Sequence, residues 1–309
     1  MILTVTMNPC FDRYDYTPSL KHGKTNRITD EYYCAAGKGI NVSKMLAALG
    51  INVLACGVAC EDIIKTIEND LGEYRISSDF IKADGNTRVN MKIRDDSGVV
   101  TELSEGGLSV NADVEKRAYM HVTRLAENAS LCVLSGSVPK GINGNFYFDV
   151  ISRLKSIGCE CVLDASGELL ANGIKAGPAI VKPNLEEFEQ LCGAVFDSVW
   201  DIADAAKKMA NKYGISAFVV SLGSRGAIIT DGNDVFFAKA PDVSVKKTTG
   251  AGDAMFAGMI SAYCEGLEND EILKRGTVAA AALVSSEPGA MITPDDLKKY
   301  SDKAEIRKL

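Results

Sequence analysis

A glycine-rich stretch at residues 246–253, KKTTGAGD, ends in one carboxylate immediately before a nearly continuous apolar segment. The apolar run over residues 254–260 predicts a centrally buried helix that begins close to Gly250. The N–H groups of its first turn have no intrahelical acceptors, so they favour an anion such as a phosphate. Asp253 could accept a proton from an attacking hydroxyl while the backbone N–H groups of Ala251, Gly252 and Asp253 hold the charge of the transferred phosphoryl group. It could equally serve as a helix cap, and this stretch alone does not separate the two interpretations.

Two other polar segments lie where predicted strands end. Ser221, Gly223 and Gly226 belong to the turn VSLGSRG, which either contacts nucleotide phosphates or ribose, or simply connects two antiparallel strands. Asn184 and Glu187, in KPNLEE, are three positions apart and share one face of a helix. They either form a capping box or orient water molecules bound to Mg²⁺.

The N-terminal part of the chain holds polar residues suited to sugar hydroxyls. Asp12 follows the first predicted strand in NPCFD, and Gly37, Lys38 and Asn41 open the first helix in GKGIN. We expect both segments at the carboxyl ends of sheet strands or on the loops beside them, where open α/β folds bind ligands. The AGKG sequence is not a P-loop, because a glycine follows the lysine where Ser or Thr is required.

Short apolar, β-branched runs alternate with helical periodicity along most of the chain. Apolar spacing indicates helices around residues 42–49 and 199–209, and the predicted strands cover residues 2–6, 53–56, 131–134, 161–163, 180–181 and 217–221. Such alternation predicts an α/β fold with a Rossmann-like, mainly parallel sheet and helices on both faces. We expect residues 1–309 to form one domain of this kind.

The segment RVNMKIR breaks this pattern because polar and apolar residues alternate strictly. Its polar side chains share one face of a strand: Arg88, Asn90, Lys92 and Arg94. A DDSG turn leads to a partner strand at residues 99–103. The hairpin is either an edge hairpin with a solvated face or part of a small β lid, inserted from about residues 12–34 and 86–104, whose basic face covers an anionic ligand. The apolar face of such a lid would pack against the lid of a second subunit.

Composition and charge narrow the function classes. The 309 residues carry 34 basic and 41 acidic side chains, a net charge of −7, which does not favour a nucleic-acid partner. No apolar run approaches the ~20 residues of a membrane span, and the N-terminus does not resemble a signal peptide. The nine cysteines form no metal-binding pattern. We interpret most of them as core residues of a cytoplasmic protein in a reducing compartment.

Seven motifs occur in the order found in one enzyme family. They are TMNPCFD, AAGKGINVSKMLAALG, TRVNMKI, SGSVPKG, VKPNLEEFE, SLGSRGA and TTGAGDAMFAG. In this order they resemble the ribokinase-like sugar kinases, and more narrowly the phosphofructokinase B branch, over essentially the whole chain. The resemblance implies ATP-dependent phosphorylation of a sugar phosphate, with Mg²⁺, on a Rossmann-like domain with a β lid. It also implies a homodimer in which the two lids clasp each other.

The resemblance further implies roles for individual residues. Asp253 resembles the catalytic base, and Gly250, Ala251 and Gly252 resemble the anion hole. The residues implied to contact the sugar phosphate are Asp12, Lys24, Arg27, Gly37, Lys38, Asn41, Arg88, Asn90 and Ser137. Among them, Arg88, together with Lys24 or Arg27, would hold the phosphate that the sugar already carries. The implied ATP contacts are Lys182, Asn184, Ser221, Gly223, Gly226 and Gly252. Asn184 and Glu187 match an element associated with Mg²⁺ through water, and backbone carbonyls of Lys247, Thr249 and the turn at residues 285–289 match a monovalent-cation site for K⁺.

Three segments depart from the family pattern. Ala36 replaces a glycine beside the sugar, and residues 102–107 differ from the corresponding stretch of close relatives. Lys246 and Lys247 occupy the region where many relatives carry Asp, and they could attract ATP phosphates instead.

From these motifs we predict a kinase of a ketohexose monophosphate. Fructose 1-phosphate, converted to fructose 1,6-bisphosphate, is the preferred substrate, and tagatose 6-phosphate or fructose 6-phosphate are the alternatives. A basic lid argues against a neutral sugar or nucleoside, which needs no cationic clamp. A non-catalytic sensor of sugar phosphate or nucleotide is the alternative from another class, although its signature, loss of the base or of the glycine loop, is not present.

Overall fold

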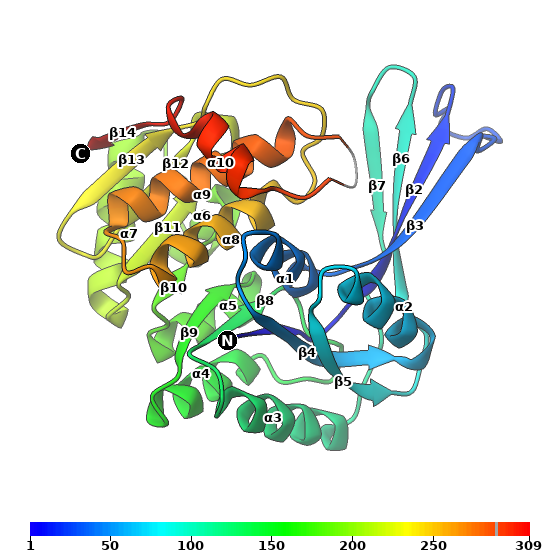
Figure 1. Ribbon diagram of the computed structural model, residues 1–309, viewed down its shortest axis with the longest axis horizontal. Helices are drawn as coiled ribbons and strands as arrows, with labels where there is room; N and C mark the ends of the chain where they lie inside the picture. Colours follow the sequence, from blue (N-terminus) through cyan, green and yellow to red (C-terminus); the bar gives the residue numbers. More distant parts are fainter. Residues whose placement is uncertain (288–289) are drawn as a thin grey trace.

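The computed structural model describes residues 1–287 and 290–309, which form two β-sheets and their flanking helices (Figure 1). Within these residues, ten strands form the main sheet in the order β14-β13-β12-β11-β10-β9-β8-β1-β4-β5. The strands from β11 to β5 run parallel, and β12, β13 and β14 extend one edge in antiparallel pairs. Their bounds are β1 Ile2–Thr6, β4 Val53–Cys60, β5 Ser77–Ala83, β8 Leu131–Ser135, β9 Glu160–Asp164, β10 Ile180–Val181, β11 Ala217–Ser221, β12 Ala227–Thr230, β13 Val235–Lys239 and β14 Glu305–Lys308.

The six predicted strands are all confirmed, and the strand predicted at residues 53–56 continues to Cys60. β1 and β8, in the middle of the sheet, are buried at every position. A parallel sheet covered on both faces requires such continuous apolar runs rather than alternation, which is why these strands could be predicted.

Helices cover both faces of the main sheet, as predicted (Figure 1). One face packs against α1 Lys38–Ala48, α2 Glu61–Gly72, α8 Ala251–Cys264, α9 Asn269–Val284 and α10 Pro294–Ser301. The other packs against α3 Ala112–Ala126, α4 Phe146–Ser156, α5 Gly167–Gly173, α6 Leu185–Cys192 and α7 Val199–Tyr213. Two short 3₁₀ turns are η1 Ile174–Ala176 and η2 Gly223–Arg225. The predicted burial of the helix after Gly252 is confirmed, because every residue of α8 from Asp253 to Ala262 is buried.

The start of α1 packs directly against the carboxyl end of β1. A Cβ on Gly39 would lie 2.3 Å from Thr6 Oγ1 and 2.7 Å from the carbonyl oxygen of Val5. Glycine therefore permits an approach of helix to strand that no other residue allows. As a result, Lys38 and Asn41 lie at the carboxyl edge of the main sheet.

A second sheet, which we call the lid sheet, projects from the body of the molecule (Figure 1, upper right). Its strand order is β3-β2-β6-β7, with bounds β2 Cys10–Thr17, β3 Asp30–Ala36, β6 Arg88–Asp95 and β7 Val100–Ser104. Three residues separate β1 from β2, so the lid sheet begins at the carboxyl end of β1. The predicted small sheet is thus present, and the division of the chain into one domain with an inserted lid stays a prediction.

The edge-hairpin interpretation of β6 is wrong. β6 pairs in parallel with β2 on one side and antiparallel with β7 on the other, so it lies inside the lid sheet. Lys92, expected on a solvated face, is only 6% exposed, whereas Arg94 on the same face is exposed. The reason is that Lys92 lies opposite Tyr14 of β2 and forms an ion pair with Asp12, which the local alternation of β6 does not reveal.

Two predictions about composition can be compared with the structure. The nine cysteines are free, and six of them are buried, as expected for core residues: Cys10, Cys56, Cys60, Cys132, Cys159 and Cys161. In the described part of the chain, no helix is long and apolar enough to cross a membrane.

Candidate active site

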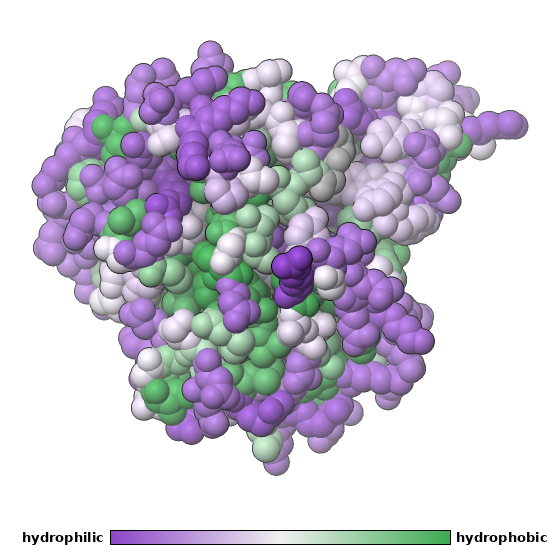
Figure 2. All heavy atoms as spheres, in the orientation of Figure 1, coloured by the Kyte–Doolittle hydropathy of each residue, from purple (hydrophilic) through white to green (hydrophobic). Residues whose placement is uncertain are grey.

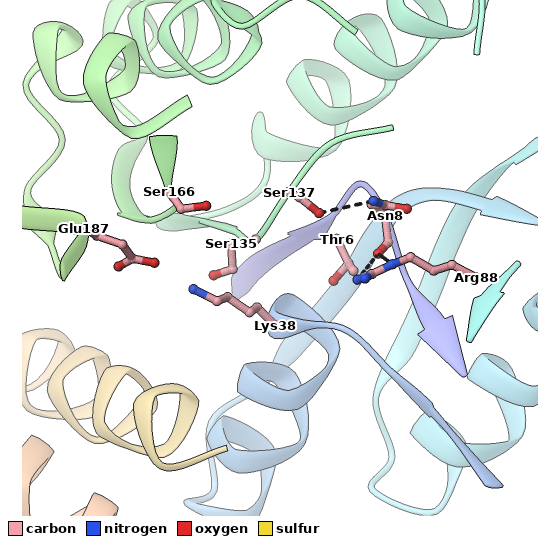
Figure 3. A pocket seen from close by; sticks show the side chains of 9 residues that line it. Thr6, Asn8, Lys38, Arg88, Ser135, Ser137, Ser166 and Glu187 are labelled. Carbon is pink, nitrogen blue, oxygen red and sulfur yellow. Dashed lines mark hydrogen bonds between the residues drawn. The ribbon is translucent and has the colours of Figure 1, made fainter. Parts of the chain in front are cut away.

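A cavity of about 240 Å³ lies where the main sheet meets the lid sheet (Figure 3). Its walls come from the ends of β1 and β8, the start of α1, the first residue of β6, the loop after β9 and the first turns of α6. The lining residues are Thr6, Asn8, Lys38, Arg88, Ser135, Gly136, Ser137, Ser166 and Glu187. Figure 3 shows Arg88 on one side of this cavity and Glu187 on the opposite side, with Lys38 between them.

Asp253 lies in the first turn of α8, next to the start of α1. Its side chain is 7% exposed, and Oδ2 accepts a hydrogen bond from Asn41 Nδ2 at 2.8 Å. Burial, helped by the negative charge of Asp164, raises the pKa of Asp253 to about 6. A carboxylate with this pKa is a stronger base than an ordinary Asp and is still ionised at neutral pH, as a general base requires.

The glycine stretch before Asp253 presents fewer free N–H groups than the sequence predicts. The N–H of Ala251 donates to the carbonyl of Thr248 at 3.3 Å, so it is not free. The first helical hydrogen bond runs from Ala254 N to Gly250 O at 2.9 Å. Among the described residues, the N–H groups of Gly252 and Asp253 have no acceptor. The start of α8 therefore offers two free N–H groups to an anion, instead of the three that the sequence predicts.

Asp164, at the end of β9, is the buried charge that holds two lysines in place. It is 1% exposed, and its carboxylate lies 3.0 Å from Lys38 Nζ and 3.4 Å from Lys182 Nζ. Although burial acts to raise it, the pKa of Asp164 lies below its ordinary value because Lys182 and Lys38 are so close. The Lys182 ammonium lies 3.7 Å from where a Cβ of Gly252 would stand, so it lies beside the first turn of α8.

Sequence reasoning missed Asp164, although a signal was available. Asp164 directly follows the buried run at residues 161–163, which was predicted as a strand. The same rule that selected Asp12, a polar residue just after a buried strand, applies to it. Ser135 and Asn8, which line the cavity, follow predicted buried strands in the same way.

Arg88 is oriented toward the cavity by the backbone after β1. Its Nε and Nη2 donate to the carbonyl oxygen of Asn8 at 3.2 and 3.0 Å (Figure 3). Its Nη1 donates to Asn90 Oδ1 at 3.3 Å. Asn8 in turn donates from Nδ2 to Ser137 Oγ at 3.1 Å. These bonds connect the lid sheet to the loop after β8 across the cavity.

Three buried side-chain atoms around the cavity lack a hydrogen-bond partner: Asn8 Oδ1, Ser135 Oγ and Asp164 Oδ2. The last of these contacts Lys182 as a charge at 3.4 Å without hydrogen-bond geometry. Unsatisfied buried polar atoms are rare in folded proteins, and their grouping in one place indicates a site built for a polar ligand.

The structure brings only some of the predicted sugar contacts into the cavity. Lys38, Arg88 and Ser137 line it, and Asn41 is held against Asp253. Asp12 forms an ion pair with Lys92, and Asn90 donates to Asp12 Oδ1 at 3.3 Å, so both are engaged within the lid sheet. Gly37 precedes α1 as its N-cap. Lys24 and Arg27 are exposed in the loop between β2 and β3 and do not line the cavity with Arg88.

The segments predicted to contact ATP lie side by side. The Ser221 N–H donates to the carbonyl of Pro183 at 3.0 Å, next to Lys182 and Asn184. The hairpin interpretation of the turn with Gly223 is confirmed, because β11 and β12 pair antiparallel around it. Gly226 has φ +112°, and a Cβ there would lie 1.8 Å from the carbonyl oxygen of Ala238. The fold of this turn therefore requires a glycine at this position, whether or not the turn contacts ATP.

The capping-box interpretation of Asn184 and Glu187 is confirmed. Asn184 N donates to Glu187 Oε2 at 2.9 Å, and Glu187 N donates to Asn184 Oδ1 at 2.8 Å. The box does not exclude a second role, since the Glu187 carboxylate also lines the cavity. No group of three or more His, Cys, Asp or Glu residues that could hold a metal occurs in the described residues. One or two carboxylates beside a polyphosphate suit Mg²⁺, which retains its waters, so these residues fit an ion carried in with ATP.

The predicted monovalent-cation site, at backbone carbonyls of Lys247, Thr249 and the turn at residues 285–289, lies beside the side chain of Lys247. Lys247 Nζ donates to the carbonyl oxygens of Glu287 and Ala290, each at 3.1 Å. Residues 288 and 289 of the predicted turn lie outside the described residues. One carbonyl of the predicted turn, that of Glu287, therefore binds a side-chain ammonium.

Comparisons with known proteins agree with this geometry. Residues 5–296 match the model of the pfkB family of carbohydrate kinases. The chain is 35% identical to the 1-phosphofructokinase of Escherichia coli strain K12, covering 92% of this chain and 91% of that protein. It is 32% identical to the 1-phosphofructokinase of Vibrio cholerae, covering 92% and 89%.

A solved structure shares the fold over nearly its full length. Phosphofructokinase-2 from Escherichia coli, in complex with potassium, has a TM-score of 0.91 and 27% identity, with 97% of this chain and 98% of that chain covered. With the family match, the related enzymes and the cavity described above, the chain belongs to the pfkB family of carbohydrate kinases and is a 1-phosphofructokinase-like phosphotransferase.

Proposed function

We propose that this enzyme transfers the γ-phosphoryl group of ATP to the 6-hydroxyl of fructose 1-phosphate, forming fructose 1,6-bisphosphate and ADP. The observation that carries the proposal is the arrangement of one cavity, with a guanidinium, Arg88, on the lid side and Lys38 and Glu187 toward the ATP segments. Arg88 suits an existing phosphate because a guanidinium binds phosphate oxygens with two parallel hydrogen bonds. The relatives named 1-phosphofructokinase support fructose 1-phosphate as the sugar.

Asp253 acts as the general base in this proposal. It takes the proton of the 6-hydroxyl as that oxygen bonds to the γ-phosphorus and the bond to the ADP oxygen breaks. The N–H groups of Gly252 and Asp253 donate to the phosphoryl oxygens, and the ammonium groups of Lys38 and Lys182 add positive charge nearby. Mg²⁺, when bound with ATP, neutralises phosphate charge, and Asn184 and Glu187 would hold it through water.

Other predicted contacts remain part of the proposal. We assign Gly37, Asn41 and Ser137 to the sugar, and Ser221, Gly223 and Gly226 to ATP. Asp12 and Asn90 would reach the sugar only after Asp12 is released from Lys92, and Lys24 or Arg27 would reach the phosphate only if their loop moves.

A substrate panel tests the proposed function. ADP release is measured with fructose 1-phosphate, fructose 6-phosphate, tagatose 6-phosphate and unphosphorylated fructose, for the wild type, Arg88→Ala and the control Arg94→Ala, which removes an exposed arginine from the same face of β6. We expect the highest kcat/KM with fructose 1-phosphate. Arg88→Ala should raise its KM by about tenfold or more, the scale of losing charged hydrogen bonds, and Arg94→Ala should not.

The panel also separates the alternatives. A preference for tagatose 6-phosphate or fructose 6-phosphate would reassign the sugar but not the reaction. An unchanged KM in Arg88→Ala would favour a neutral sugar, and absence of ADP release with every sugar would favour a sensor.

We also propose that the lid sheet joins two copies of the chain. Six of its large apolar side chains are exposed: Ile28, Tyr32, Tyr33, Val99, Val100 and Leu103. In the space-filling view the visible surface of the lid at the upper right is mainly hydrophilic, with small hydrophobic areas at its outer edge (Figure 2). Tyr33 and Leu103 lie on one face of the lid sheet with Met91 and Ile93, whereas Tyr32 and Val100 lie on the other face. The face with Tyr33 and Leu103 suits a self-complementary contact.

Sedimentation analysis tests the lid contact. We expect the wild type to sediment as a dimer and Leu103→Asp to sediment as a monomer, because a charge placed in an apolar interface is strongly unfavourable. Val195→Asp, a change at a 79% exposed position outside the lid, is the control and should remain dimeric. A monomeric wild type would contradict this part of the proposal.

A further inference from the structure

The side chain of Lys247 is bound to backbone carbonyls and not to an acidic side chain. Its ammonium donates to the carbonyl oxygens of Glu287 and Ala290 at 3.1 Å each, and the side chain is only partly exposed. Burial lowers the pKa of Lys247, as expected for an ammonium partly removed from water. Converging carbonyl oxygens form the kind of surroundings in which proteins bind small cations.

The backbone that carries Lys247 is bound to the end of α9. The N–H groups of Lys246 and Lys247 both donate to the carbonyl of Val284, at 2.7 and 3.2 Å, and Val284 is the last residue of α9. The ammonium of Lys247 then binds two carbonyls of the segment that follows this helix, those of Glu287 and Ala290. Both the backbone and the side chain of Lys247 are therefore held against the end of α9 and the residues after it.

The neighbouring lysine is arranged differently. Lys246 is exposed, and its ammonium forms an ion pair with the exposed carboxylate of Glu287. The two adjacent lysines thus differ in what they bind: one binds a surface side chain and the other binds the backbone.

The loop that carries Lys247 also shapes the anion hole. Thr248, the next residue, accepts the N–H of Ala251 at 3.3 Å, and Gly250 follows with φ +82° at the start of α8. Fixing Lys247 against the segment after α9 therefore restrains the backbone from which the N–H groups of Gly252 and Asp253 project.

We propose that Lys247 is a built-in cation that replaces a bound monovalent ion beside the anion hole. It acts as a positioning residue, not a catalytic one, because it restrains residues 246–250 against the end of α9. A second positive charge at the same carbonyls would be repelled by the ammonium, so we infer that ATP binding by this enzyme does not depend on K⁺. The inference uses the ATP binding of the proposed function as a readout, and the stability readout below is independent of it.

The test compares KCl with tetramethylammonium chloride at equal concentration. The affinity for a non-hydrolysable ATP analogue is measured by calorimetry, and the unfolding temperature is measured without nucleotide. For the wild type we expect the same values in both salts. Lys247→Ala opens space at the two carbonyls, so in tetramethylammonium it should weaken analogue binding about tenfold or more and lower the unfolding temperature, and KCl should restore both.

Three further variants complete the design. Lys247→Met removes the charge but fills the space, so its loss of affinity should not respond to KCl. Lys247→Arg keeps the charge and should bind the analogue as the wild type does in either salt. Lys246→Met, the matched neighbour, should show no response to K⁺.

Either of two results would overturn the inference: K⁺ raises analogue affinity or unfolding temperature of the wild type, or Lys247→Ala behaves like the wild type in both salts. If Lys247→Ala folds in neither salt, the inference is still tested by comparing the two salts for the wild type and for Lys247→Arg. If no sugar of the panel gives ADP release but the salt experiments give the expected results, the proposed substrate is contradicted and the inference about Lys247 is still supported.

Discussion

Asp253→Asn should lower kcat for ADP release at least ~10²-fold, while the affinity for ATP changes little. An amide cannot accept the proton of the 6-hydroxyl, but its oxygen can still accept the hydrogen bond from Asn41 Nδ2, so the start of α8 should keep its geometry. Stopped assays of ADP formation give kcat, and calorimetry with an ATP analogue gives the affinity. Near-normal turnover in this variant would rule out Asp253 as the base.

The pH dependence of the wild type gives an independent readout of the same group. Burial raises the pKa of Asp253 from an ordinary value of 3.8 to about 6, so protonation should reduce kcat/KM as the pH falls through about 6. The residual activity of Asp253→Asn should lack this step. A step at the same pH in both proteins would assign it to another group.

The same shift has a consequence for stability. Because the folded-state pKa is above the unfolded one, ionised Asp253 disfavours the folded state at neutral pH, and this penalty disappears as the pH falls from about 6 to below 3.8. Asp253→Asn removes the buried charge, so its unfolding temperature at neutral pH should not be lower than that of the wild type. This control separates lost catalysis from lost folding.

Asp164→Asn should have the largest effect on stability. It leaves the buried ammonium of Lys182, and the half-buried side chain of Lys38, without the carboxylate that lies 3.4 and 3.0 Å from their Nζ atoms. Removing one partner of a buried ion pair commonly costs about 3–5 kcal/mol. We expect a loss of this order in the free energy of unfolding, measured in urea, and a higher KM for both substrates because each lysine faces one of them.

Asp234→Asn is the control for this experiment. Asp234 forms an exposed ion pair with Lys308 at 2.8 Å, with about half of each side chain in solvent. Exposed pairs contribute roughly 0.2–1 kcal/mol, so the control should change stability little. Equal effects of the two substitutions would show that Asp164 does not stabilise the two lysines.

Local patterns were sufficient to predict most of the fold. The strands at the centre of the main sheet are continuous apolar runs, and α8 is apolar on all sides, so their burial follows from composition over a few residues. The strands β13 and β14 were not predicted. β14 lies at the edge of the main sheet and has a single apolar residue, Ile306, so its sequence carries no apolar run.

The candidate site was only partly predictable, because its charges come from distant parts of the chain. Asp164 and Lys38 are 126 positions apart, and Asp12 and Lys92 are 80 apart, so no spacing in the sequence relates them. The first pair determines which lysines face the cavity, and the second determines that Asp12 is engaged inside the lid sheet. Pairs of this kind exist only after α1 has been brought to β9 and β2 to β6.

The sequence by itself determined the fold class, the reaction class and the position of Asp253 at the start of a buried helix, because each depends on residues close together in the chain. Only the tertiary structure decided the basicity of Asp253, which burial and the nearby Asp164 produce. It also decided the difference between Lys246 and Lys247. Two identical neighbours differ because the carbonyls after α9 reach one ammonium and a surface carboxylate reaches the other.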